Sequence, residues 1–358
     1  MARIAILGTR ESGKTVLMTV LAKRYQNRVG DEPFLKAMDP RTMSFTEKNW
    51  HRLTVERDWP PLTPPGELMQ LHWELEHAGQ SHGMQLFDFA GETFRQVFGK
   101  HQLTDPAVRN RLSADPFCGP LLAELDRADV LVLLINLRDF INRNNAPDGL
   151  EHLLENQWAL RGALDYFAPR LKNRIALVFT QIDQYPELVN GRAKWRDVLR
   201  EHLPSTQIAD IYQNLSCMGV AAVPETELAV GADGQPFLRP AANFSGWYLE
   251  SLMEFMVKTC AVVRADAEDR EAQQIAAQLL ANERQAEQQA KECEAKAYKS
   301  LGWAGGSFVV GLLLVDKQTA WGGLFIVSAV VMAILGAIEF GNRPVVRRRN
   351  VPPPVPKH

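Results

Sequence analysis

The chain has 358 residues, of which 46% are hydrophobic and 23% are charged, and its formal net charge is -2. These values are typical of a folded protein and exclude a chain that is disordered throughout. The 40 Lys and Arg residues are balanced by 42 Asp and Glu residues, so we expect no nucleic-acid partner, which would require a basic excess. Four widely spaced cysteines predict neither a disulfide framework nor a zinc site.

Short apolar runs alternate with longer amphipathic stretches over residues 1–263, which predicts an α/β domain with a doubly wound, mostly parallel sheet. Two runs are joined only by a turn at residues 77–80, so they predict a hairpin that contributes one antiparallel strand. Residues 223–246 resemble a second, inserted hairpin. The expected strands are Arg3–Leu7, Leu68–Glu76, Gly83–Asp88, Val130–Asn136, Arg174–Thr180 and Leu215–Val223. The expected helices are Lys14–Arg28, Gly149–Phe167, Arg192–His202 and Trp247–Arg264.

A glycine-containing loop joins the first expected strand to the first expected helix. It spans Gly8–Thr15, reads GTRESGKT and matches the phosphate-loop pattern GxxxxGK[ST]. In such a loop the backbone N–H groups surround a phosphate chain, and the helix N-terminus adds partial positive charge. We expect Lys14 to reach the β- and γ-phosphates and Thr15 to coordinate Mg²⁺. The other expected phosphate-binding residues are Gly8, Arg10, Glu11, Ser12 and Gly13. A glycine turn that binds nothing is the alternative.

Two further segments follow in an informative order. Asp88–Gly91 reads DFAG and resembles the DxxG motif of Ras-like GTPases, whose Asp holds Mg²⁺ through water and whose Gly contacts the γ-phosphate. Thr180–Asp183 reads TQID and resembles the [NT]KxD motif, whose Asp accepts two N–H bonds from guanine. Adenine lacks those donors, so Asp183 favours GTP over ATP. With the phosphate loop, these segments make residues 1 to about 260 resemble the TRAFAC class of P-loop GTPases. The resemblance implies nucleotide contacts from Gly91, Thr180, Gln181 and Asp183 and a metal contact from Asp88.

The same class uses a threonine that closes over Mg²⁺ and a fifth, guanine-contacting loop. Thr63 fits the first role best, because it lies in a proline-rich loop before the run that starts at Leu68, and Thr42 is the alternative. The fifth loop is expected either at Ser216–Met218, with Ser216 as the contact, or around Val223.

Two departures from the class pattern affect the expected chemistry. Gln181 replaces the usual lysine, whose stem packs on the guanine ring. Glu92 stands where Ras-like enzymes place the glutamine that orients the attacking water, and its charge predicts slow intrinsic hydrolysis. Lys14, Thr63 and Glu92 are the expected catalytic residues. Arg95, or another arginine in the long segment Thr93–Arg127, is a candidate arginine finger, with a surface arginine as the alternative. The layout resembles the bacterial double-GTPase-type proteins, which implies a role in defence or signalling.

Beyond the nucleotide-binding domain, residues 264–300 contain no Gly or Pro and favour one long helix, which is either a plain stalk or a coiled coil. Leu301–Val315 and Ala320–Ile338 are strongly apolar and predict a transmembrane hairpin over residues 301–340. Basic residues flank both sides, so the first domain and the basic, proline-rich tail at 341–358 are expected in the cytoplasm. A re-entrant segment with one span, a single span after a buried helix, and a soluble core hairpin are the alternatives.

These features predict a multi-pass membrane protein that uses GTP and Mg²⁺ as a conformational switch on an unknown protein effector. The lipid bilayer is its other expected partner, and the stalk or the transmembrane hairpin offers a route to self-association. A nucleotide-dependent membrane scaffold without hydrolysis and a dynamin-like membrane remodeller are the alternatives.

Overall fold

The computed structural model describes residues 2–9, 11–64, 68–89, 91–99, 103, 105–116, 118–141, 149–190, 195–202, 215–231, 234–315 and 331. The chain divides into two compact units, Met1–Ala267 and Glu268–His358. The first unit contains every described strand.

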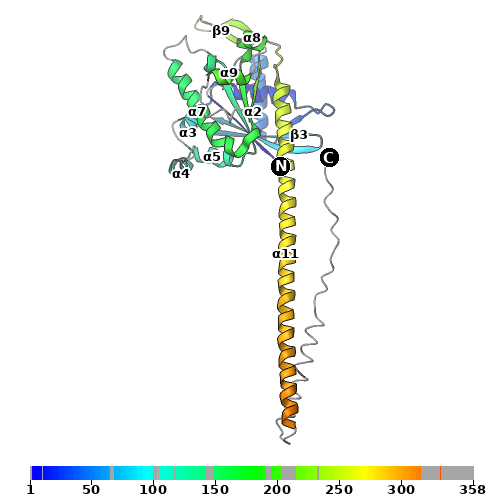
Figure 1. The fold of residues 1–358 in the computed structure, drawn as a ribbon. Coiled ribbons are helices and arrows are strands. Elements are labelled where there is room, and N and C mark those ends of the chain that lie inside the picture. The colour runs from blue at the N-terminus through cyan, green and yellow to red at the C-terminus, as the bar shows by residue number, and fades with distance from the viewer. Residues whose placement is uncertain are drawn as a thin grey trace. The chain divides into compact units, whose positions relative to one another are not determined.

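A seven-stranded sheet in the order β2-β3-β4-β1-β5-β6-β7 forms the centre of the first unit (Figure 1). Strand β1 pairs in parallel with β4 and β5, and β6 and β7 continue the parallel arrangement. Only β3 runs against its neighbours, β2 and β4, which confirms the predicted single antiparallel strand. The strand bounds are β1 Arg3–Gly8, β2 Phe34–Ala37, β3 Leu68–His77, β4 Gln80–Phe89, β5 Val130–Asn136, β6 Ile175–Thr180 and β7 Leu215–Gly219.

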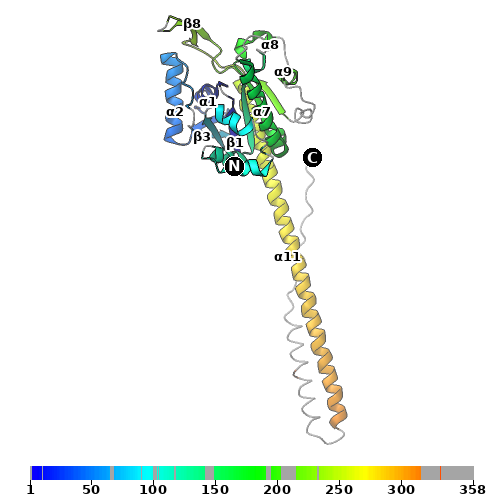
Figure 2. The same ribbon diagram turned by 90° about the vertical axis from the view of Figure 1, so that its left-hand side faces the viewer.

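The central strands are covered on both faces, because their side chains alternate between two apolar cores. In β5, for example, Leu131 and Leu133 belong to one core, whereas Val130 and Val132 belong to the other. The first core is closed by α3, α5 and α7, and the second by α1, η1 and the first turns of α11. Figure 2 shows α2 and α7 on opposite sides of the sheet. This two-layer covering confirms the predicted doubly wound sheet.

The helices of the first unit connect the strands, and three of them (α3, α4 and α5) fill the chain between β4 and β5. A helix labelled η is a π-helix at η1 and a 3₁₀-helix at η2 and η3. The helix bounds are α1 Lys14–Arg24, α2 Pro40–His51, η1 Arg52–Glu56, α3 Gly91–Phe98, α4 Pro106–Ser113, α5 Cys118–Asp126, α6 Arg138–Ile141, α7 Gly149–Leu171, η2 Lys172–Arg174, η3 Ile182–Gln184, α8 Pro186–Asn190, α9 Trp195–His202 and α11 Leu249–Val315.

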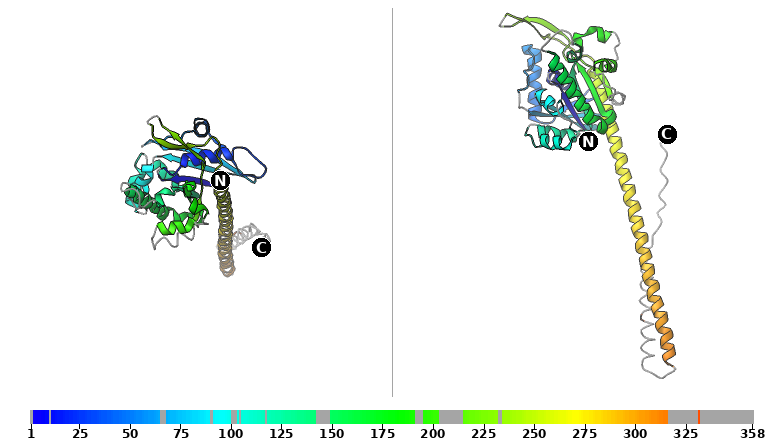
Figure 3. Two further views of the ribbon diagram at one scale, coloured as in Figure 1. Left: turned by 90° about the horizontal axis from the view of Figure 1, so that it is seen from above. Right: turned by 60° about the vertical axis from the view of Figure 1, so that its left-hand side comes forward.

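The predicted inserted hairpin is present as β8 (Thr226–Val230) and β9 (Pro236–Pro240). It forms a separate two-stranded sheet, which the right view of Figure 3 shows extending away from the seven-stranded one. In β8 the side chains of Leu228 and Val230 are about 70% exposed, and Leu238 in β9 is 53% exposed. One face of the hairpin is therefore apolar and open to solvent.

Helix α11 runs from Leu249 to Val315 without a break. It joins three segments that the sequence treats separately: the last domain helix, the 264–300 stalk and the apolar residues 301–315. Within the described part of the chain, no helix combines the length and the hydropathy that a membrane span needs. Residues 301–315, the first predicted span, form the last part of α11. The second predicted span, 320–338, lies outside the described residues except for Val331, as does the tail at 341–358.

Candidate nucleotide-binding site

The candidate site lies at the carboxyl ends of the parallel strands, where a doubly wound sheet leaves a crevice for ligands. The phosphate loop follows β1, Asn136 ends β5, Thr180 ends β6, and Val220 follows β7. These segments border one pocket of about 780 Å³. The lining residues are Glu11–Leu17, Trp59–Pro64, Asn136, Arg138, Thr180, Gln181, Asp183, Gln184, Val220, Ala222, Val223, Thr226 and Leu238.

The phosphate loop has the backbone shape that its sequence predicts. A Cβ atom on Gly8 would lie 2.3 Å from Ser12 Oγ and 2.9 Å from the Leu134 carbonyl oxygen, so only glycine fits there. Glu11 and Gly13 are left-handed, with φ of 57° and 70°, and this turns the backbone into a concave loop ahead of α1. Ser12 is 1% exposed, and its Oγ has no hydrogen-bond partner among the described residues.

Lys14 lies inside this loop. Its Nζ donates to the carbonyl oxygens of Gly8 and Thr9, both at 3.2 Å, and the residue is only 7% exposed. Thr15 is the next residue of α1 and also borders the pocket. The loop therefore holds a buried ammonium group and a hydroxyl at the N-terminus of a helix, which suits a phosphate chain with its bound cation.

The Thr180–Asp183 segment is tied to the phosphate loop. Thr180 Oγ1 donates to the Ile135 carbonyl at 3.1 Å, and Gln181 Nε2 donates to the Glu11 carbonyl at 3.1 Å. Asn136 Nδ2 donates to the same Glu11 oxygen at 3.3 Å. Gln181 thus holds the loop through an uncharged amide where the class pattern has a lysine.

Asp183 borders the pocket and carries a perturbed carboxyl group. Burial raises its pKa to about 6, against the opposing effect of a hydrogen bond from its own backbone N–H. The negative charge of Glu225 adds to the rise. A carboxylate that is poorly solvated in this way gains from a ligand that offers two N–H donors.

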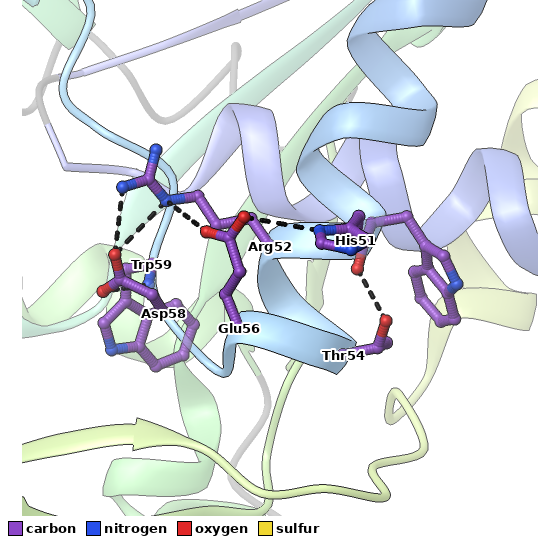
Figure 4. Close-up of polar contacts among 7 residues, drawn as sticks. His51, Arg52, Thr54, Glu56, Asp58 and Trp59 are labelled. Carbon is purple, nitrogen blue, oxygen red and sulfur yellow. Dashed lines mark hydrogen bonds and ion pairs between the residues drawn. The ribbon is translucent and has the colours of Figure 1, made fainter.

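Residues 59–64, which include Thr63, also border the pocket. Figure 4 shows the polar contacts of the residues that lead into this segment, from His51 to Trp59. Helix α2 passes into the π-helix η1, which ends at Arg57 in the left-handed region with φ of 57°. The Arg52 guanidinium donates to Asp58 Oδ2 from Nη2 at 3.0 Å and from Nε at 3.3 Å. Asp58 Oδ1 accepts the Trp59 N–H at 2.9 Å, so the turn into the proline-rich stretch is held on both sides.

The structure separates the two threonine candidates. Thr63 borders the pocket. Thr42 lies in the first turn of α2 and is fully buried; its hydroxyl donates to Asp39 and accepts the His72 N–H at 2.9 Å. Thr42 therefore binds Asp39, the N-cap of α2, and the backbone of β3, and Thr63 remains the candidate for the metal.

The two proposed positions of the fifth loop are also separated. Ser216 is the second residue of β7 and is not among the residues that border the pocket, whereas Val220, Ala222 and Val223 are. This placement favours the residues around Val223 over Ser216, because a ligand meets the end of a parallel strand rather than its start.

The DxxG segment lies next to β1. Asp88 is near the end of β4, which pairs with β1, and Gly91 is the first residue of α3. The side chains of Asp88 and Glu92, and all of Arg10, lie outside the described residues. Arg95 forms an ion pair with Glu155 on α7 and does not border the pocket, so the structure gives it a role between helices instead of the finger role.

Several lining residues escaped the sequence analysis. Asn136 could have been found, because it is the one polar residue in the run Val130–Asn136 and ends that strand. Thr226 and Leu238 carry no recognisable signal, since their position depends on how the β8–β9 hairpin folds back. Trp59 begins the proline-rich loop that was expected to hold Thr63, but no role was expected for Trp59 itself. Arg138 follows β5 and reaches the pocket from α6.

Comparison with known proteins gives one family match and several structural likenesses. The family model described as Double-GTPase 2 matches residues 2–227, more than half of the chain. No curated protein matches the sequence. Similar solved structures include the translation elongation factor SelB from Methanococcus maripaludis in complex with the GTP analogue GppNHp, at 12% identity and a TM-score of 0.33, covering 73% of this chain and 34% of that chain. Another is Roco2 RocCORdC of Methanosarcina barkeri bound to GDP, at 11% identity and a TM-score of 0.28, covering 62% of this chain and 43% of that chain. The present chain thus matches less than half the length of either neighbour.

Proposed function

The chain belongs to the Double-GTPase 2 family of P-loop GTPases, and from this premise we propose that it is a GTP- and Mg²⁺-dependent conformational switch with slow intrinsic hydrolysis. The observation that carries the proposal is the convergence of three separate segments on one pocket. The phosphate loop, the Thr180–Asp183 segment and the loop with Thr63 are far apart in the chain, yet they border the same cavity. A phosphate site and a guanine-selective carboxylate in one cavity fit a guanine nucleotide.

The residues present fit GTP and its metal ion. Lys14 would bind the β- and γ-phosphates, and Asp183 would accept the two N–H groups of guanine. Thr15 and Thr63 would hold Mg²⁺ directly, and Asp88 would hold it through a water molecule. The bound cation would neutralise charge on the β- and γ-phosphates. The buried Ser12 hydroxyl, which lacks a partner among the described residues, is a further donor for a phosphate oxygen.

The proposal extends to the membrane and to partners. The apolar segments at 301–315 and 320–338 support an anchor that leaves the GTPase domain and the C-terminus in the cytoplasm. Ile275, Leu279 and Leu280 on α11 are each more than half exposed, which supports self-association along this helix or docking of an effector. A role in a bacterial defence or signalling system follows from the family resemblance and stays a prediction.

Nucleotide binding is the experiment that tests the proposal. Fluorescent GTP and ATP are titrated with Mg²⁺ into the full chain and into Lys14→Ala, Asp183→Ala and Asp197→Ala. Asp197 is an exposed aspartate on α9 that pairs with Arg200 one turn further along the same helix, and it serves as the matched control. We expect GTP selectivity in the full chain and in the control, and losses of about a hundredfold in the other two variants, since each loses charge-assisted bonds. Equal binding of ATP, or binding of neither nucleotide, would contradict the proposal.

Single-turnover hydrolysis tests the slow rate separately. We expect Glu92→Gln to hydrolyse bound GTP faster than the natural chain, because the amide orients water without placing negative charge beside the phosphates. An unchanged or lower rate in that variant would remove Glu92 from the explanation, and no turnover in either chain would favour the scaffold function without hydrolysis.

A further inference from the structure

The segment that carries Thr63 is attached to a part of the chain that lies about 180 residues further on. Trp59 Nε1 donates to the Leu238 carbonyl oxygen at 2.8 Å, and Arg57 Nε donates to the Pro240 carbonyl at 3.4 Å. The Arg57 guanidinium also pairs with Glu227 on β8. Both strands of the β8–β9 hairpin therefore hold residues 57–59.

Glu227 is the centre of these contacts. Its Oε1 accepts a hydrogen bond from Arg239 Nε at 2.8 Å and lies 2.7 Å from Arg239 Nη2, in addition to the ion pair with Arg57. Arg239 lies directly opposite Glu227 in the hairpin register, so the cross-strand pair fixes the position of the carboxylate that also pairs with Arg57. One carboxylate thus joins the hairpin to the start of the 57–64 segment.

The segment is stiff enough to transmit this attachment. Pro60, Pro61 and Pro64 each have a fixed φ, and Asp58 holds the Trp59 N–H at 2.9 Å. Only Leu62 separates Pro61 from Thr63. A displacement at Trp59 therefore moves Thr63, because few rotatable bonds lie between them to absorb it.

The hairpin also contributes to the pocket itself through Thr226 and Leu238. The Leu238 carbonyl accepts the hydrogen bond from Trp59. Leu238, Trp59 and Thr63 all border the cavity. The wall formed by residues 57–64 and the hairpin is thus one connected unit, and opening it requires loss of the contacts at Trp59 and Arg57.

We propose that the β8–β9 hairpin is a latch that holds residues 57–64 over the nucleotide, with Glu227 and Trp59 as positioning residues for Thr63. This inference rests on the proposed function and adds its regulation: release of the Glu227 and Leu238 contacts sets the rate at which bound nucleotide leaves. Anything that displaces the hairpin then acts as an exchange factor without touching the nucleotide.

The test uses the full chain and the variants Glu227→Gln and Trp59→Phe. The first removes the charge at the centre of the latch, and the second removes the indole N–H but keeps an aromatic ring in the wall. Glu254→Gln is the matched control, because Glu254 forms an exposed ion pair with Lys258 at 2.6 Å on α11, away from the pocket residues. Two quantities are measured: the dissociation rate of a fluorescent GDP, and the hydrogen exchange of the Trp59, Leu62 and Thr63 amides without nucleotide.

We expect both latch variants to release GDP about tenfold faster or more, and to exchange these amides faster, while the control does neither. Thermal unfolding monitors the whole domain, and we expect it to change little, since the Glu227 side chain is 40% exposed and Trp59→Phe keeps an aromatic ring against the core.

Unchanged exchange at Trp59, Leu62 and Thr63 in both variants would overturn the latch. So would faster exchange with no change in GDP release. If the natural chain binds no guanine nucleotide, the proposed function fails, and the exchange measurement still decides whether the hairpin holds the segment.

Discussion

Asp183 is a residue whose burial lowers the stability of the folded chain at neutral pH but favours ligand binding. Burial of Asp183 raises its pKa to about 6, so the folded chain without ligand holds a proton that the unfolded chain releases at lower pH. Its contribution to stability is therefore present in acid and lost as the pH rises through about 6. At neutral pH the Asp183 carboxyl group is ionised but poorly solvated, and the ionised form is the one that can accept two N–H bonds from guanine.

This pKa leads to a pH dependence of nucleotide affinity. Only the ionised Asp183 accepts two N–H bonds, so GTP affinity should fall about tenfold when the pH is lowered from about 7 to about 5. Titrations of fluorescent GTP across this range measure the fall. Glu225→Gln removes the neighbouring negative charge that raises the pKa, so its midpoint should move to lower pH. A flat profile for the natural chain would show that Asp183 does not bind the base.

Gly162 on α7 is a second residue whose size matters. A Cβ atom there would lie 2.1 Å from the carbonyl oxygen of Phe98, at the end of α3. We expect Gly162→Ala to push the two helices apart and to lower the free energy of unfolding by about 1–3 kcal/mol. Urea denaturation measures the loss. Gly83→Ala is the control, since a Cβ there meets only the Ala2 carbonyl at 3.9 Å; an equal loss in both variants would contradict the steric explanation.

At the scale of elements, the first turns of α11 complete the domain. Leu249, Leu252, Met253 and Met256 are each at most 1% exposed and belong to the core on one face of the sheet. Arg24 and Arg174 form ion pairs with Glu250 and Asp266 on the same helix. The domain therefore needs these turns, although they belong to a helix that continues far beyond it.

A pair of truncations on this helix tests that dependence. Met256→Ala should lower the free energy of unfolding by about 2–5 kcal/mol, because it leaves a cavity under the sheet. Val262→Ala, at a position that is 53% exposed, should change it by less than about 0.5 kcal/mol. Chemical denaturation of both variants provides the comparison, and similar losses would mean that α11 does not pack as a core helix.

The sequence was most informative where local pattern and tertiary role coincide. The run Val130–Asn136 is uniformly apolar up to its last residue, and it is a central strand with the predicted bounds. Strand β2 escaped prediction because it lies at the sheet edge and its four residues, FLKA, do not form an apolar run. The helices α3, α4 and α5 also escaped prediction, since no strand or helix was expected between Asp88 and Val130.

The same contrast holds for the candidate site. The phosphate loop and Asp183 were found from their motifs, because their chemistry depends on short fixed spacings. The contact between Trp59 and Leu238 could not be found, because it joins residues about 180 apart and depends on the hairpin register. Contacts of this kind leave no periodic or local signature in one sequence.

At the scale of the whole molecule, the chain combines a nucleotide-binding unit with a helix that continues into an apolar segment. The 67 residues of α11 correspond to about 100 Å of helix at 1.5 Å per residue. Its residues Glu268–Gln289 are exposed throughout, and they include Ile275 and Leu279. The described part of the chain thus has apolar side chains on this helix that no other described residue covers.

The anchor proposal makes a whole-molecule prediction. In a flotation assay with vesicles, the full chain should rise with the lipid, whereas a chain that ends at Ser300 should remain at the bottom. Both chains should bind GTP equally, which controls for folding of the first unit. Flotation of the shorter chain, or its absence in the longer one, would remove residues 301–340 as the anchor.

The π-helix η1 also restricts how many residues can separate α2 from Arg57. It adds a wide turn between α2 and residue 57, closed by the Arg57 N–H on the Arg52 carbonyl. Loss of one residue from Arg52–Glu56 would let α2 continue as a regular helix, but it would rotate everything after it by about 100°. Arg57 and Trp59 would then face away from the hairpin. In chains descended from the same ancestor, we therefore expect substitutions within residues 52–59 to be tolerated more readily than insertions or deletions.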